Sequence, residues 1–105
     1  MTPDELKLRF ELVRQSIAGW TADTAHFVGA ASEVRQTGTP NHDDLAAAER
    51  TLRSVVAERE AFTASVDEAE VVDDDLARGV EVALNELSLL ERDLGSAVEA
   101  MSAAK

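Results

Sequence analysis

The side chains of this sequence best suited to chemistry are two histidines, because the chain contains no cysteine and no tyrosine. A histidine can act as a general base or bind a metal ion, but either task needs a partner group at a fixed spacing. The Glu-x-x-His pattern of di-iron helical bundles is missing, since no glutamate stands three residues before His26 or His42. We therefore expect both histidines to lie on the surface without a catalytic role.

Three consecutive carboxylates, Asp73 to Asp75, suggest a calcium loop. An EF-hand loop requires oxygen ligands at positions 1, 3 and 5, glycine at 6 and glutamate at 12. A loop that starts at Asp73 has Ala77 at position 5 and Leu84 at position 12, and a loop that starts at Asp74 has Leu76 at position 3. Both registers fail, so we expect the acidic cluster to cap the start of a helix, where negative charge is stabilising.

Other catalytic signatures are missing from the sequence. It contains no Gly-x-Gly-x-x-Gly motif, no phosphate-binding P-loop and no Gly-x-Ser-x-Gly nucleophile elbow. Serines and acids are plentiful, but they carry little weight without a pocket and an orienting third group. The sequence therefore predicts a protein that is not an enzyme and that needs no cofactor and no metal ion.

The charge of the chain is strongly negative and unevenly placed. The net charge is −11, with five acids and four bases in residues 1–40 against sixteen acids and six bases in residues 41–105. Phosphate backbones and anionic membranes both attract basic surfaces, so direct binding to nucleic acid or to a membrane is disfavoured. No basic and then apolar run opens the sequence, and no apolar stretch approaches the length of a membrane span. We expect a soluble, cytoplasmic protein.

Two breaks divide the chain into three segments. The first is Thr37 to Asn41, where Gly38 suits a helix C-cap and Thr39 followed by Pro40 suits the start of the next helix. The second break is centred on residues 71–75. At the N-terminus, Thr2, Pro3 and Glu5 match the N-cap, N1 and N3 positions of a capping box.

Apolar residues recur alternately three and four positions apart in each segment, which is a heptad pattern and not the alternation of a strand. The first seam consists of Leu6, Phe10, Val13, Ile17, Trp20, Thr24, Phe27, Ala31 and Val34. The second consists of Leu45, Ala48, Leu52, Val55, Arg59, Phe62, Val66 and Ala69. The third consists of Leu76, Val80, Ala83, Leu87, Leu90, Leu94, Ala97 and Met101. Outside the seams, ion pairs are expected for Glu5–Arg9, Glu49–Arg53 and Asp74–Arg78.

The first seam continues through Gly19 and Gly29 without a slip, so residues 3–36 are predicted to form one helix with Trp20 in the core. Within the second seam, the Arg59 stem can pack while its guanidinium reaches solvent or a carboxylate. Residues 42–70 and 74–103 complete the set of helices. We predict one all-α domain spanning residues 1–105, an antiparallel up-down-up three-helix bundle with coiled-coil-like packing. The alternative is a helical hairpin that dimerises.

Three helical families offer partial resemblances. The chain resembles a spectrin-type repeat in its length, its three heptad helices, its tryptophan midway along the first helix and the stretch Glu58 to Phe62; the third helix lacks a second aromatic anchor. It is similar to secreted Trp-X-Gly hairpin proteins in size and lack of cysteine, but Thr21 and Ala22 follow Trp20. Ala25 to Gly29 resembles the H-x-x-K-G motif of histidine-phosphotransfer domains without its lysine. These resemblances imply a helical bundle and transfer no function.

Four large apolar residues fall outside the seams. Leu8 and Leu12 lie one helical turn apart in the first segment, and Val82 and Leu89 lie one heptad apart in the third. A contiguous patch of such residues marks a protein contact. The leading hypothesis is a non-catalytic helical interaction module, an adaptor, scaffold or assembly factor, that binds a protein partner or a second copy of itself. The alternative is an acidic mimic of nucleic acid that inhibits a DNA- or RNA-binding protein, because a basic partner would match the −10 net charge of residues 41–105.

Overall fold

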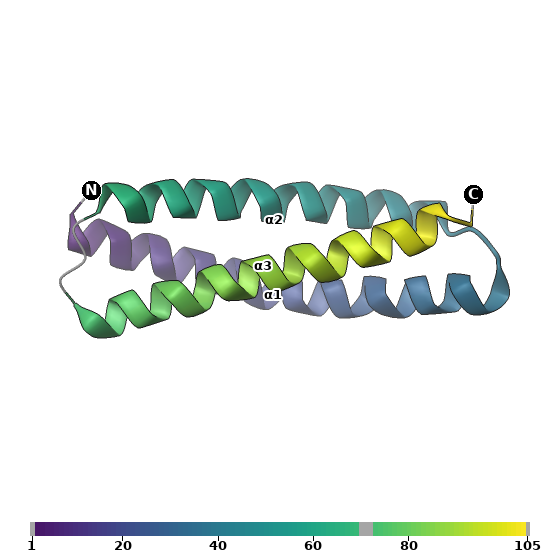
Figure 1. Cartoon of the computed structure of the whole chain (residues 1–105), viewed down its shortest axis with the longest axis horizontal. Helices are drawn as coiled ribbons and strands as arrows, with labels where there is room; N and C mark the ends of the chain where they lie inside the picture. Colours follow the sequence, from purple (N-terminus) through teal and green to yellow (C-terminus); the bar gives the residue numbers. More distant parts are fainter. Residues whose placement is uncertain (1, 70–72, 105) are drawn as a thin grey trace.

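The protein folds as three long helices connected by short turns (Figure 1). The computed structural model describes residues 2–69 and 73–104. The helices are α1 (Pro3–Thr37), α2 (His42–Glu68) and α3 (Asp74–Ser102). The chain runs up, down and up along a rod of 52 × 18 × 16 Å, so α1 and α3 are parallel and α2 is antiparallel to both. This arrangement confirms the predicted three-helix bundle, and the structure does not adopt the alternative hairpin.

The helix ends follow from their capping residues. Thr2 Oγ1 accepts a hydrogen bond from the Glu5 backbone N–H at 3.2 Å, as the predicted cap requires. Gly38 ends α1 in the left-handed conformation, with φ of 68°, which glycine adopts without a steric penalty. Asp73 Oδ1 accepts hydrogen bonds from the backbone N–H groups of Asp75 and Leu76, so part of the acidic cluster has the predicted capping role.

The predicted start of the second helix needs a correction. Thr39 does not cap α2, because the helix begins three residues later, at His42. The Thr39 backbone N–H donates to Thr37 Oγ1 at the end of α1. Asn41 is the cap instead, accepting from the Asp44 N–H at 3.1 Å and donating through Nδ2 to the Asp44 carboxylate at 2.8 Å. The boundaries otherwise agree within two residues of the predicted ranges. Glu70 and residues 71–72 of the second break lie outside the described residues.

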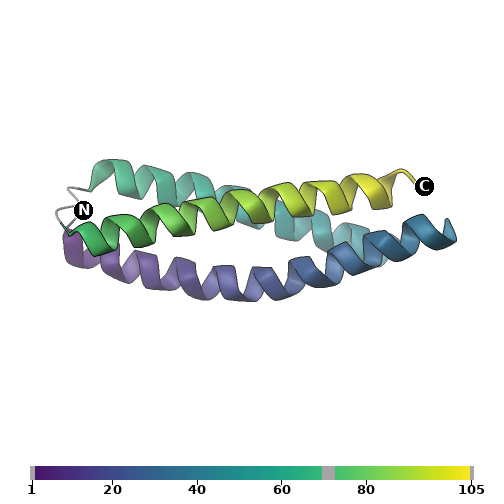
Figure 2. The ribbon, with the colours of Figure 1, turned by 60° about the horizontal axis from the view of Figure 1, so that its bottom comes forward.

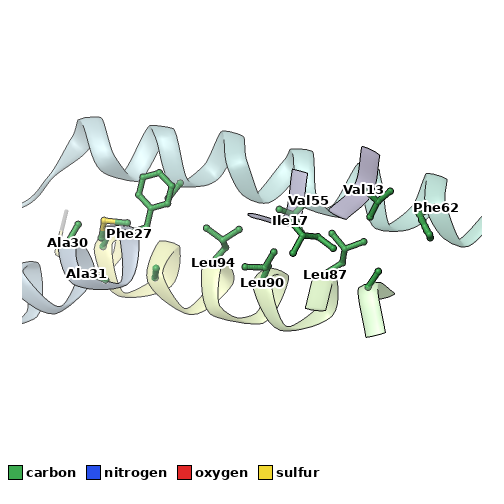
Figure 3. Packing of buried hydrophobic residues seen from close by; sticks show 14 of the residues in the cluster. Val13, Ile17, Phe27, Ala30, Ala31, Val55, Phe62, Leu87, Leu90 and Leu94 are labelled. Carbon is green, nitrogen blue, oxygen red and sulfur yellow. The ribbon is translucent and has the colours of Figure 1, made fainter. Parts of the chain in front are cut away.

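The core is formed by the three predicted seams (Figure 3). All eight seam residues of α3 are buried, and Val13, Ile17 and Phe27 of α1 meet them from one side. Phe62 of α2 is fully buried. Each large aliphatic or aromatic side chain removed from water in this way contributes roughly 1.5–3 kcal/mol to folding.

Trp20 and Thr24 of the α1 seam depart from a simple apolar core. Trp20 packs against the core but is only half-buried, because an indole is too large to be enclosed easily between two helices. Thr24 is buried, with 5% of its surface exposed, and its Oγ1 has no hydrogen-bond partner among the residues that the structure describes. The helix that carries both residues is continuous and gently curved, with its convex side toward solvent (Figure 2).

Candidate interaction surface

The large apolar residues that the sequence places outside the seams are exposed in the structure. Leu8 is 66% exposed, Leu12 48%, Val82 55% and Leu89 49%. A fifth residue of this class, Val28, is 48% exposed and was not predicted from the sequence. Its position directly after the seam residue Phe27, at the edge of the buried side of the helix, was the indication that the sequence offered.

The structure does not bring the four predicted residues together. Leu12 lies one turn beyond Arg9, whose guanidinium pairs with Glu58 of α2, so Leu12 belongs to the flank of α1 that faces α2. Val82 instead lines a hollow together with Phe10, on the opposite flank of α1. Two separate apolar surfaces result, one on the outside of α1 and one along the border between α1 and α3.

The border between α1 and α3 contains a hollow of about 420 Å³ near Phe10. It is lined by Phe10, Arg14, Arg78, Gly79, Val82, Ala83 and Glu86. Gly79 leaves room for the Phe10 ring, because a Cβ atom at this position would lie 2.7 Å from Cζ of that ring and would displace it. The Arg14 guanidinium stands over the same ring at 5.6 Å from its centre and pairs with Glu11 at 3.2 Å. The hollow is therefore lined by apolar side chains together with two arginines, in a chain whose net charge is strongly negative.

Farther along the same border, Val28 lines a smaller hollow of about 160 Å³ with Ala31, Arg35, Asp93, Ser96 and Ala97. Arg14, Val28 and Arg35 are separated by multiples of seven residues, so residue 21 of the same series also faces this border. Ala18 and Ala25 lie one turn from these positions and are exposed. Leu89 lies one heptad after Val82 and therefore shares its side of α3. We call the surface formed by Ala18, Thr21, Ala25, Val28, Val82 and Leu89 the α1/α3 face.

Charged side chains form ion pairs between the helices. Arg59 Nε donates to Glu91 Oε2 at 2.6 Å, so the seam arginine reaches a carboxylate of α3 as expected. The hydrogen bond and the charge of Glu91 raise the pKa of the Arg59 guanidinium. The expected pair Glu5–Arg9 does not form, because Arg9 reaches across to Glu58. Within residues 2–69 and 73–104, the other two expected intrahelical pairs are also not formed.

Both histidines are exposed, as predicted. His26 Nε2 lies 3.2 Å from Asp44 Oδ1 of α2, and the imidazole meets the Phe27 ring edge-on at 5.5 Å. His42 lines a polar hollow at the turn between α1 and α2. Asp23 stands three residues before His26, but among the described residues no group of three or more potential ligands is placed to hold a metal ion.

Of the helices described, none combines the length and apolar character that crossing a membrane would require. Comparisons of the chain with protein-family models, with curated proteins and with solved structures find no match.

Proposed function

We propose that this protein is a non-catalytic helical interaction module that binds another protein, or a second copy of itself, through apolar side chains on the outside of the bundle. The observation that supports the proposal is the set of five large apolar residues that are between 48% and 66% exposed although the core is complete without them. Exposed leucine and valine contribute nothing to the solubility of a monomer, and clusters of them mark contact surfaces. The proposed location of the protein is the cytoplasm, as expected from the sequence.

The experiment compares capture of proteins from the native source by the wild type and by surface variants. Leu12→Glu and Leu89→Glu each place a carboxylate on one of the two apolar surfaces, and Ala57→Glu on the exposed side of α2 is the matched control. The proposal predicts that a leucine variant, but not the control, loses a bound protein or loses self-association, while circular dichroism shows an unchanged helix content. A protein that binds nothing, or whose binding is unchanged by both leucine substitutions, would refute the proposal.

A second candidate function is mimicry of a nucleic acid toward a basic partner, and the excess of sixteen acids over six bases in residues 41–105 favours it. Salt separates the two candidates. Binding through opposite charges weakens steeply as ionic strength rises, whereas an apolar contact does not. Capture of a partner that persists at high salt would therefore exclude the mimic.

A further inference from the structure

Three heptad helices can close into a bundle in two ways, which differ in hand. In one arrangement a given flank of α1 meets α2, and in the arrangement of opposite hand the same flank meets α3. The apolar seams do not choose between the two, because they face the common centre in both. The choice therefore depends on residues at the borders between the helices.

Two ion pairs lie at the borders of α2. Arg9 Nη2 of α1 lies 2.5 Å from Glu58 Oε1. On the other border, Arg59 Nε donates to Glu91 Oε2 of α3 at 2.6 Å. These four side chains are only 21–33% exposed, so solvent and salt screen the pairs less than they screen charges on the outer faces. Glu58 and Arg59 are thus consecutive residues of opposite charge that face different neighbouring helices.

The arrangement of opposite hand would bring Arg59 to a basic flank of α1. In that arrangement, the Arg59 side of α2 would meet the flank of α1 that faces α3 in the structure. This flank carries Lys7 and Arg14, which line hollows at the border between α1 and α3, and one acid, Glu11. Arg14 lies only five residues after Arg9, and so lies near the ion pairs of α2. Arg59 would lose a carboxylate and gain cationic neighbours, which is unfavourable.

The same change would bring Glu58 to an acidic flank of α3. The Glu58 side of α2 would meet the flank of α3 that faces α1 in the structure. This flank carries Glu86 and Asp93, with Arg78 farther toward the start of the helix. Glu86 lies five residues before Glu91, and so lies near the present ion pair of that residue. Glu58 would exchange a guanidinium for carboxylates, which is again unfavourable.

We propose that the order of charges at Glu58 and Arg59, matched by Arg9 and Glu91, fixes the hand of the bundle. The hand in turn determines which surfaces the protein presents. In the arrangement of opposite hand the α1/α3 face would not exist, because its α1 half and its α3 half would both meet α2. The proposal concerns the fold and holds whether or not this face binds a partner.

The test exchanges the two charges of α2 and leaves the composition unchanged. Glu58→Arg combined with Arg59→Glu, the exchange variant, places like charges across both borders of the present bundle and opposite charges across those of the other hand. We expect it to favour the other hand. The matched control is Glu49→Arg combined with Arg50→Glu, a second consecutive pair on α2 that forms no ion pair within the described residues.

Two introduced thiols report the hand, since the chain has no cysteine of its own. Ser16 lies seven residues after Arg9 and Thr51 lies seven residues before Glu58, so they face each other across the antiparallel α1 and α2. Ser16→Cys with Thr51→Cys should oxidise readily to an intramolecular disulfide in the wild-type background and in the control. In the exchange variant the disulfide should form roughly tenfold or more slowly, because the two positions no longer share a border.

A compensated variant separates a change of hand from simple loss of stability. Adding Arg9→Glu and Glu91→Arg to the exchange variant restores both pairs with reversed polarity, so the rate of disulfide formation should return to that of the wild type. Circular dichroism should show the same helix content in all the variants. Rapid disulfide formation in the exchange variant, failure of the compensating changes to restore it, or an exchange variant that unfolds would each overturn the proposal.

Discussion

Replacement of Thr24 by valine should stabilise the bundle. The Thr24 hydroxyl is buried among apolar seam residues, and its Oγ1 has no hydrogen-bond partner among the described residues. An unsatisfied buried polar group costs about 1–3 kcal/mol, and valine has nearly the shape of threonine without the hydroxyl. Both residues are β-branched, so their helix propensities differ little. We expect Thr24→Val to raise the free energy of unfolding by about 1–2 kcal/mol.

Thermal and urea unfolding followed by circular dichroism measure this change. For a domain of this size, 1 kcal/mol corresponds to roughly 4–8 °C in Tm, so a rise of about 5–10 °C is expected. The dependence of stability on urea should stay constant, because the surface exposed on unfolding is unchanged. Thr63→Val is the matched control: Thr63 is exposed, its Oγ1 donates to the Arg59 carbonyl, and its replacement should change stability by less than about 0.5 kcal/mol. A lower Tm for Thr24→Val would show that the hydroxyl has a partner in solution and that the reasoning is wrong.

Three further substitutions test the packing. Gly19→Ala should stabilise α1 by about 1 kcal/mol, since the new Cβ would meet no described atom within 4 Å. If urea unfolding shows no increase in the free energy of unfolding, the prediction is wrong. Gly79→Ala should gain less or lose stability in the same assay, because its Cβ must displace the Phe10 ring. Phe62→Ala should cost about 3–5 kcal/mol, as expected for a fully buried aromatic, and a loss below about 1 kcal/mol would contradict the core described above.

The sequence predicted the features of the fold that depend on residues close together in the chain. The heptad seams identify which side of each helix is buried, because side chains three and four positions apart share a face. The caps at Thr2, Gly38 and Asp73 are local, and they were predicted correctly. Asn41 was missed as a cap because Thr39 followed by Pro40 offered a competing start, and only the hydrogen bonds of the folded turn decide between them.

The features that depend on the neighbouring helix could not be predicted. A heptad pattern identifies the core side of α1 but not which flank meets α2 and which meets α3. The Arg9–Glu58 pair depends on that assignment, as does the separation of Leu12 from Val82. For the same reason the arginine in the second seam could be expected to reach a carboxylate, but Glu91 could not be named as its partner.

The most direct test of the proposed association uses the absence of cysteine from the chain. A single Ala25→Cys substitution places the only thiol on the α1/α3 face, and Ala57→Cys places it on the exposed side of α2. Cross-linking with a short bifunctional thiol reagent should give a covalent dimer for Ala25→Cys and not for Ala57→Cys, and adding Leu89→Glu should abolish the product. Equal yields from the two positions, or no dimer from Ala25→Cys, would contradict self-association through the apolar side chains of this face.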